Sequence, residues 1–271
     1  MSLLLILLSS ACILSSSSES DYLSSHDESV IYKADFSPLQ PSSPDSICTT
    51  LTLSTSPLLI YLTSFVSPDE ATHLLRLCQD RYSPSSLITS PSSDTAPPPP
   101  TYRTSTSCTL PNEDPVILAL TSRVYTFLRS LDIEADGIEP FQAVRYQPSQ
   151  HYDLHYDWFE TPILNADNRE YNRLTSIFLY LEANCSESGG TYFPRVSVSG
   201  DVLDEEERSE KRFGKGKNGG GVVVRPVVGN GVFWVNLKAD SEGDERVLHA
   251  GLPVEEGSKV GLNIWVTRLM S

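Results

Sequence analysis

Short segments rich in β-branched and aromatic residues fill the chain after Glu139, and they constrain the fold more than any other feature. Turn residues separate the segments and no helical pattern lies between them, which is typical of a sandwich, a jelly roll or a barrel. The sequence therefore predicts a mainly β domain. The segments are 141–146, 151–159, 174–183, 189–194, 221–228, 231–237, 246–254 and 259–269.

Two helices are expected before this series. An apolar, β-favouring run at 58–66 leads into Ser67, Pro68 and two acidic residues. These supply a helix N-cap, a first-turn proline and negative charge at the positive end of the helix dipole, so we predict a helix over about 68–82. Apolar residues recur at helical spacing in 115–131, which predicts a second helix packed on a sheet.

The length and composition suit one large domain. The 271 residues are 39% hydrophobic and 20% charged, which is enough for a full core and too few for several domains with linkers. The net charge of -15 argues against binding to nucleic acid or to an anionic membrane, because both need an excess of Lys and Arg. We expect no nucleic-acid partner and no stable membrane insertion.

Several segments lie outside this expected core. The first apolar run breaks into serine and is too short to span a bilayer, so we predict a signal peptide over 1–19, with a buried first strand as the alternative. A poorly ordered lead-in is expected over 20–56 and the globular domain over 57–271. The proline-rich segment 83–100 predicts an exposed loop, and the glycine-rich, charged segment 200–221 a mobile surface insertion. The localisation expected from this start is the secretory pathway, in the endoplasmic reticulum lumen or outside the cell.

Four cysteines would remain after removal of the signal peptide: Cys48, Cys78, Cys108 and Cys185. An even set can form two disulfides in an oxidising compartment, although the spacing does not define the pairing. None of the four has the spacing of metal ligands, so we expect bridges or buried small apolar residues.

Histidines in the β-rich half offer a metal site. His155 and Asp157 lie two residues apart, and such residues share one face of a strand, so both side chains can point into one cavity. A second histidine from a distant strand, such as His249, would complete two imidazoles and one carboxylate, a set that suits non-haem Fe(II) and leaves positions open for substrate and O2. By spacing alone, His151 and Asp153 form an equally good pair.

The surrounding residues decide between these two pairs. They resemble the catalytic domain of prolyl 4-hydroxylases, among the 2-oxoglutarate- and Fe(II)-dependent dioxygenases, over roughly residues 58–271. In that family a Tyr stands nine residues before the first ligand, followed by Gln-x-Tyr-x-x-His-x-Asp-x-Phe. Starting from His151 matches nothing, whereas the His155 register matches with Tyr146, Gln150, Tyr152, His155, Asp157 and Phe159.

Later segments continue the resemblance. The family's strand of the form T-x-x-x-Y-L is matched with 175–181, its Gly-Gly, Thr and Phe-Pro with 189–194, and its Pro-x-x-Gly before an apolar strand ending in Asn with 226–236. The last motif is a His, a Lys ten residues later and a Trp six residues after that. His249, Lys259 and Trp265 have this spacing.

The resemblance implies a fold and a set of roles. It implies a mainly β fold with flanking α helices and a double-stranded β-helix, or jelly-roll, core, with the catalytic core over 137–269. Fe(II) would be held by His155, Asp157 and His249. The distal carboxylate of 2-oxoglutarate needs a cation deeper in the barrel, which would be Lys259, while Tyr146 and Thr191 would donate hydroxyl hydrogen bonds and Trp265 would wall the pocket. The positions expected to line a peptide groove are Arg103, Thr104, Ser105, Glu139, Tyr152 and Arg173.

The expected activity is that of a procollagen-proline 4-dioxygenase: O2- and 2-oxoglutarate-dependent 4-hydroxylation of proline in a proline-rich peptide or protein, releasing succinate and CO2, with L-ascorbate keeping the iron reduced. The same chemistry on another peptide residue or on a small molecule is the alternative enzyme. A non-catalytic β-sandwich binding module with structural histidines is the alternative from another class. The chain departs from the family at Ser149, where Gly is usual, and lacks one residue before Thr191.

Overall fold

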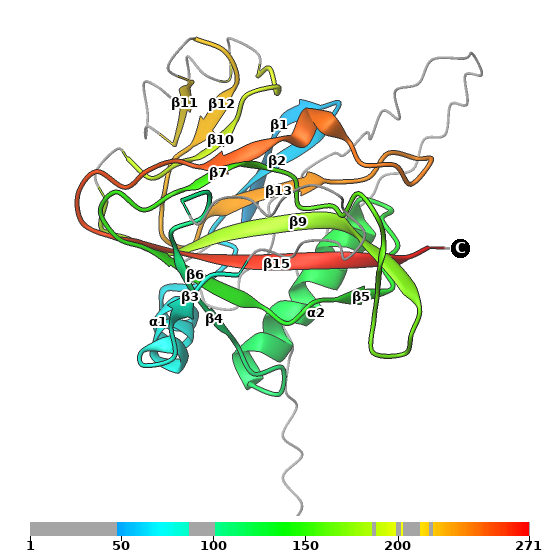
Figure 1. The fold of residues 1–271 in the computed structure, drawn as a ribbon, viewed down its shortest axis with the longest axis horizontal. Coiled ribbons are helices and arrows are strands. Elements are labelled where there is room, and N and C mark those ends of the chain that lie inside the picture. The colour runs from blue at the N-terminus through cyan, green and yellow to red at the C-terminus, as the bar shows by residue number, and fades with distance from the viewer. Residues whose placement is uncertain are drawn as a thin grey trace, which may run out of the picture.

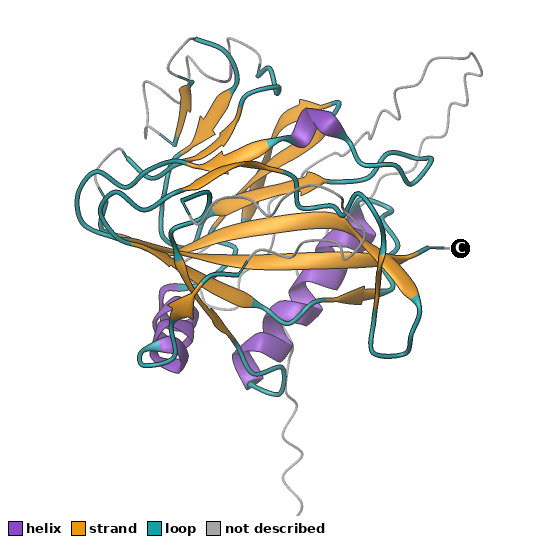
Figure 2. Cartoon of the chain, in the orientation of Figure 1, coloured by secondary structure: helices purple, strands orange, loops and turns teal. Residues whose placement is uncertain are grey.

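A computed structural model describes residues 48–86, 101–185, 188–198, 202, 212–216 and 219–270. Within them the chain forms two antiparallel sheets and two α-helices, as Figures 1 and 2 show. The predicted mainly β, jelly-roll fold with flanking helices is confirmed. The signal peptide, most of the lead-in, residues 87–100 and most of the 200–221 insertion lie outside the described residues, so the predictions for them stay predictions.

The larger sheet has the strand order β1-β2-β13-β9-β15-β6-β4-β3, with β5 added beside β15 and β8 beside β9. Its long central strands, β9 and β15, pair along most of their length. The strands are β1 Thr49–Thr55, β2 Leu58–Thr63, β3 Ser83–Pro84, β4 Thr106–Thr109, β5 Gly137–Ile138, β6 Gln142–Tyr146, β8 Ile163–Leu164, β9 Glu170–Ala183, β13 Gly231–Val235 and β15 Lys259–Leu269.

The smaller sheet lies over one face of the larger sheet, with the order β11-β12-β10-β14-β7 (Figure 1). A short 3-10 helix, η1 Glu245–Val247, leads into β14. The strands are β7 Tyr152–His155, β10 Thr191–Phe193, β11 Phe213–Lys215, β12 Val222–Val224 and β14 His249–Gly251. The edge strand β11 begins inside the predicted 200–221 insertion, because Phe213 is buried between the sheets while its backbone pairs with β12.

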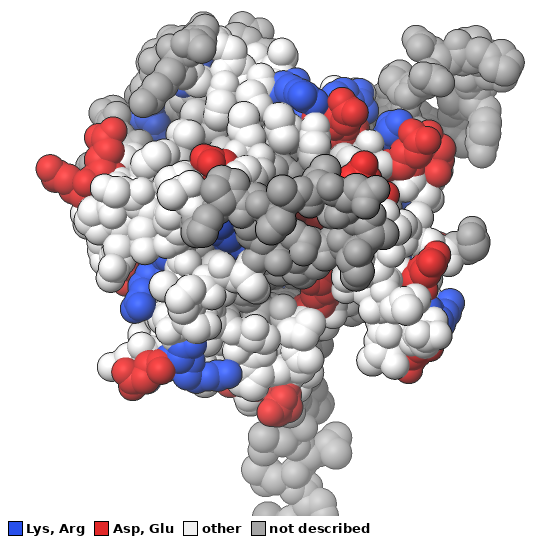
Figure 3. Space-filling view, viewed as in Figure 1, with Lys and Arg blue, Asp and Glu red and all other residues white. Residues whose placement is uncertain are grey.

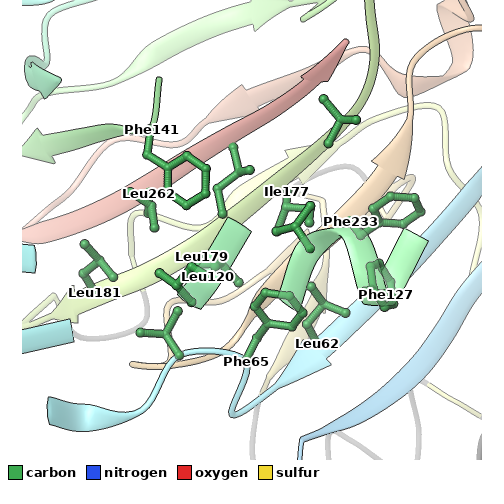
Figure 4. Close-up of a cluster of buried hydrophobic side chains, with 14 of the residues drawn as sticks. Leu62, Phe65, Leu120, Phe127, Phe141, Ile177, Leu179, Leu181, Phe233 and Leu262 are labelled. Carbon is green, nitrogen blue, oxygen red and sulfur yellow. The ribbon is translucent and has the colours of Figure 1, made fainter. Parts of the chain in front are cut away.

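Alternating side chains on the larger sheet separate two cores. On β2, Ile60 and Leu62 pack toward the helices, whereas Leu59 and Tyr61 pack toward the smaller sheet. Figure 4 shows part of the helix-side core, in which Phe127 meets Phe65 and Phe233 at ring-centroid distances of 6.0 and 5.1 Å. Both faces of the larger sheet are therefore covered, which holds its strands rigidly beneath the smaller sheet.

Helix α1 spans Pro68–Cys78 and begins with a capping box: Ser67 Oγ accepts a hydrogen bond from the Glu70 backbone, and the Glu70 carboxylate accepts one from the Ser67 backbone. The helix ends four residues before the predicted end at 82. Isolated turns continue to Arg81, and the chain then extends into β3, where Pro84 disfavours helix in the residue before it.

Helix α2 spans Pro115–Ser130, one residue shorter than predicted. Asp114 caps it by accepting hydrogen bonds from the backbone N–H groups of Val116 and Ile117. Its buried face, which includes Leu120 and Phe127, packs on the larger sheet. Across the described residues, neither helix is both long and apolar enough to cross a membrane.

The folded domain begins earlier than expected. Thr49–Thr55 lies in the predicted lead-in 20–56, yet it forms β1 and pairs with β2. The reason is that Leu53 is buried against the inter-sheet core with Leu51 beside it, so this segment does bury apolar side chains.

Of the two disulfides that four cysteines allow, the described residues contain one, between Cys78 at the end of α1 and Cys108 in β4. Cys48 is buried, and Cys185 is a buried thiol. Ser149, where the resembling family has Gly, adopts a φ of 69°, a left-handed conformation that glycine enters at lower cost.

Candidate active site

Two neighbouring strands of the smaller sheet bring the three predicted metal ligands together. His155 ends β7 and His249 begins β14, and the two residues are paired across these strands. Asp157 lies two residues after His155, just beyond β7. One potential ligand atom from each of the three residues lies within 4.8 Å of the other two. The Nε2 atoms of both histidines are 3.8 Å from Asp157 Oδ1. These three atoms face a common point.

Backbone carbonyls orient both imidazoles. His155 Nδ1 lies 2.7 Å from the carbonyl oxygen of Asp153, and His249 Nδ1 lies 3.0 Å from that of Val247. A carbonyl can only accept, so each Nδ1 carries the hydrogen and each Nε2 keeps a lone pair for a metal. Burial, followed by the neighbouring His249, holds the pKa of His155 well below its usual value, which favours the neutral form that binds metals.

The carboxylate ligand is held ionised. Burial raises the pKa of Asp157, but His249 and His155, followed by Arg173 and a hydrogen bond from Ser176, lower it, and the net shift is downward. Two neutral imidazoles and a carboxylate, arranged around one point, fit Fe(II) with further positions left for ligands. The structure thus supports the predicted donor set.

A cavity with about 370 Å³ of empty space adjoins this point. Burial raises the pKa of Tyr146, which keeps its hydroxyl protonated as a donor. The indole N–H groups of Trp234 and Trp265 are buried and have no acceptor among the described residues. The cavity is lined by Tyr146, Tyr152, His155, Asp157, Phe178, Thr191, Trp234, His249, Gly251, Asn263 and Trp265.

Thr191 lies on β10, where its hydroxyl is 2.8 Å from the hydroxyl of Tyr180. The Phe178 ring leans over Gly261 of β15, the partner of Tyr180 in the sheet: a Cβ at Gly261 would lie 2.0 Å from Phe178 Cζ, so the glycine leaves room for this ring beside the cavity. Sequence reasoning named Thr191 but missed Phe178, Trp234 and Asn263. These three residues lie in predicted strands and belong to no motif, so only the fold identifies them as cavity residues.

Lys259 is completely buried at the start of β15. It pairs across the sheet with Tyr146, and its Nζ lies 4.4 Å from the Tyr146 ring centroid and donates to the carbonyl of Gly189. It therefore lies behind the Tyr146 wall of the cavity rather than on the cavity surface. Burial lowers its pKa to about 8, and no carboxylate of the described residues pairs with it. A buried ammonium without an acidic partner suits an anion supplied from outside.

A larger cleft, with about 860 Å³ of space that includes open solvent, lies beside the predicted ligand Asp157. Glu139 and Arg173 form a two-contact ion pair in its wall, with both N–O distances 2.7 Å. The Arg173 guanidinium also lies 3.7 Å from the Trp265 ring centroid, so it links the cleft to the cavity. The cleft is lined by Ser86, Arg103, Thr109, Glu139, Pro140, Gln142, Tyr152, Tyr156, Asp157, Trp158, Phe159, Arg173 and Trp265.

Most of the predicted groove residues lie here. The Arg103 guanidinium is 4.6 Å from the Tyr152 ring centroid, and Tyr152 stacks on the metal ligand His155 at 3.5 Å. Ser105 instead is buried beneath the cleft, where its hydroxyl accepts from Arg103. Thr104 donates its backbone N–H to the carbonyl of His151 and does not line the cleft.

The alternative ligand pair does not join the metal point. His151 Nε2 lies 3.4 Å from Asp153 Oδ1 at a more exposed position. The metal-ligand cluster found among the described residues contains neither of them. The register chosen through the surrounding motif is therefore the one that the fold brings to His249.

Comparison with known proteins agrees with this geometry. The family model described as the 2OG-Fe(II) oxygenase superfamily matches residues 141–267. The chain is 27% identical over 237 residues to Prolyl 4-hydroxylase 2 of Arabidopsis thaliana, covering 83% of this chain and 73% of that protein. It is 29% identical over 217 residues to Prolyl 4-hydroxylase 1 of the same plant, covering 79% of this chain and 70% of that protein.

Among solved structures, the fold is similar to that of a viral collagen prolyl hydroxylase from Paramecium Bursaria Chlorella virus-1 in complex with 2OG. The TM-score is 0.54 and the identity 24%, covering 77% of this chain and 95% of the viral chain. At this identity the likeness concerns the fold.

Proposed function

We propose that the chain is a 2-oxoglutarate- and Fe(II)-dependent oxygenase with a prolyl 4-hydroxylase-type catalytic domain, and that it 4-hydroxylates proline in a peptide or protein chain. The observation that carries the proposal is the convergence of His155, Asp157 and His249 where a smaller cavity meets a larger cleft. The cavity suits the small co-substrate and the cleft suits the peptide.

Different residues of the chain would bind the metal and the co-substrate. His155, Asp157 and His249 would hold Fe(II), which together with 2-oxoglutarate as a co-substrate would activate O2, the oxidant of the reaction. Tyr146 offers a hydrogen bond within the cavity, and Lys259 behind Tyr146 offers the positive charge for the distal carboxylate. Binding of that carboxylate would replace the missing acidic partner of the buried lysine.

The cleft can hold an extended, proline-containing peptide. Its floor includes the aromatic residues Tyr152, Trp158 and Trp265, which can pack against proline rings. Polyproline segments are extended before binding, so they lose little entropy on docking in an aromatic groove. These features support a proline-rich substrate such as a procollagen-like or cell-wall-type chain.

Two further properties belong to the proposal. L-ascorbate would keep the iron reduced, as the resemblance implies. We also propose that the chain folds and acts in the secretory pathway, in the endoplasmic reticulum lumen or outside the cell. The Cys78–Cys108 disulfide supports this location, because disulfides persist in oxidising compartments.

The direct test is the release of succinate from 2-oxoglutarate by purified protein with Fe(II) and ascorbate, with and without a proline-rich peptide. We expect the peptide to increase succinate release and His249→Ala to abolish it. His151→Ala, which removes the histidine of the alternative pair, should retain it. Succinate release stimulated by a small molecule but by no peptide would reject the proposed substrate class.

A further inference from the structure

We propose that Ser176 and Asn236 are positioning residues that fix Asp157 as a one-oxygen metal ligand. Ser176 Oγ lies 2.6 Å from Asp157 Oδ2, and Asn236 Nδ2 lies 2.8 Å from Ser176 Oγ. The three side chains form a hydrogen-bonded chain that ends on the ligand. The inference rests on the proposed function, because it concerns the same metal site.

The direction of each hydrogen bond follows from the groups present. An amide nitrogen only donates, so Asn236 Nδ2 must give its hydrogen to Ser176 Oγ. The serine hydroxyl has one hydrogen of its own, and with the amide donating to its oxygen this hydrogen is directed at Asp157 Oδ2. Asn236 thereby fixes the orientation of the Ser176 hydroxyl as a donor to the carboxylate.

This donation distinguishes the two oxygens of the carboxylate. Oδ2 is engaged by Ser176, whereas Oδ1 is the oxygen that lies 3.8 Å from Nε2 of both His155 and His249. The aspartate is thus prevented from rotating to present both oxygens to a metal. A single-oxygen aspartate leaves more of the metal's coordination positions for the co-substrate and O2.

The surroundings make the chain rigid and dry. Ser176 and Asn236 are 1% and 0% exposed, so water cannot easily replace either hydrogen bond. The Asn236 backbone is fixed on both sides, because its N–H donates to Leu174 and its carbonyl accepts from Asp244. Ser176 lies on β9 and Asn236 directly follows β13, so the larger sheet orients a ligand that is delivered by the smaller one.

The test compares metal affinity, measured by titration calorimetry of the full metal-free chain with Mn(II). Removing a hydrogen-bond partner of a metal ligand costs about 10–100-fold in metal affinity, which is the loss expected for Ser176→Ala. Ser176→Thr keeps the hydroxyl and should retain most of the affinity. Thr175→Val is the matched control, because this neighbour is also fully buried but its hydroxyl has no partner among the described residues.

Asn236→Leu gives a second, independent measurement. It should weaken Mn(II) binding less than Ser176→Ala does, because the hydroxyl remains but is free to turn away. In the Ser176→Ala background it should cause no further loss, since Asn236 acts through the serine. The Fe(II)–2-oxoglutarate charge-transfer band, recorded without O2, should shift in Ser176→Ala and be unchanged in Thr175→Val.

The outcomes separate this inference from the proposed function. Wild-type protein that binds Mn(II) while Ser176→Ala binds it equally well, with an unchanged charge-transfer band, would overturn the role of the chain and leave the oxygenase intact. Additive losses in the double variant would overturn the role of Asn236. Wild-type protein that binds neither Mn(II) nor Fe(II) would overturn both proposals.

Discussion

At the scale of single residues, Lys259 lowers the stability of the ligand-free protein and is proposed to bind 2-oxoglutarate. It is buried without an acidic partner, and burial lowers its pKa to about 8. Its position could be predicted from its spacing to His249. Its contacts with Tyr146 and Gly189 could not, because those residues arrive from other strands.

Lys259→Met should therefore stabilise the protein without ligands while abolishing 2-oxoglutarate binding. Methionine fills a similar volume without a charge, and the lowering of the pKa from 10.5 to about 8 corresponds to a gain of about 3 kcal/mol at neutral pH. Unfolding in urea measures the gain, and calorimetry with Mn(II) and 2-oxoglutarate measures the binding. Lys238→Met, at an exposed lysine, should change neither.

The pH dependence of the protein's stability follows from the lowered pKa of Lys259. Folded Lys259 loses its proton near pH 8, whereas the unfolded chain keeps it to about 10.5. Between these values the unfolded state binds more protons, so wild-type stability should rise with pH through this window. The advantage of Lys259→Met should shrink over the same range. An advantage that stays constant from pH 7 to 10 would contradict a buried, charged Lys259.

Ser176 is a site residue that a sequence motif alone can identify. The T-x-x-x-Y-L pattern has its hydroxyl residue four positions before the Tyr, and the residue four positions before Tyr180 is Ser176, one position after Thr175. The structure puts the Ser176 hydroxyl on the Asp157 carboxylate. Counting the spacing strictly could have found Ser176, whereas the contribution of Asn236 required the register of β9 and β13.

At the scale of elements, local signals predicted the helix starts better than the ends. Ser67 and Asp114 are capping residues that act within their own helices, so sequence identifies them. The end of α1 depends on Pro84 in a strand that forms only through long-range pairing. The same holds for β1, whose leucines acquire a core only after the sheets have assembled.

Glu70 links the two helices as well as capping one. Its carboxylate pairs with Arg123 of α2 at 2.9 Å while accepting from the Ser67 backbone. Glu70→Gln keeps a capping acceptor but loses the charge, so we expect the free energy of unfolding to fall by about 1–3 kcal/mol. Chemical denaturation at pH 7 measures the loss, with the exposed Glu113→Gln as the control.

The loss of stability caused by Glu70→Gln should also depend on pH. Burial raises the pKa of Glu70, but Arg123 and the Ser67 contacts outweigh it, so the pKa lies below its usual 4.5. A lowered carboxyl pKa stabilises the folded state above the unfolded value, and this stabilisation disappears as the pH falls through the folded value. Wild type and Glu70→Gln should therefore converge in acid. A difference that persists there would exclude the ion pair as its cause.

At the scale of the whole molecule, the series of short β-rich segments without intervening helices predicted a mainly β domain. The two cores that the larger sheet separates became apparent only in the structure. Acidic and basic side chains are interspersed on the face drawn in Figure 3. The cysteine pairing could not be predicted, since Cys78 and Cys108 meet only when α1 packs beside β4.

Replacing both Cys78 and Cys108 by serine should lower the free energy of unfolding by about 3 kcal/mol, because the bridge closes a loop of 30 residues in the unfolded chain. β4 pairs with β6, which carries Tyr146 into the cavity, so the cleft edge should also loosen. Thermal melting with and without a reducing agent measures the effect. An unchanged melting temperature in the double variant would show that the bridge adds nothing to stability.

The central claim is that His155, Asp157 and His249 serve the hydroxylation of peptidyl proline. The most direct measurement supplies isotopically labelled O2 with Fe(II), 2-oxoglutarate and a proline-rich peptide, and follows the label by mass spectrometry. We predict one labelled oxygen in 4-hydroxyproline, one in succinate, and neither with His249→Ala. Labelled succinate without labelled hydroxyproline in any proline-rich peptide would contradict the assigned substrate, and the absence of label from both products would contradict the enzyme.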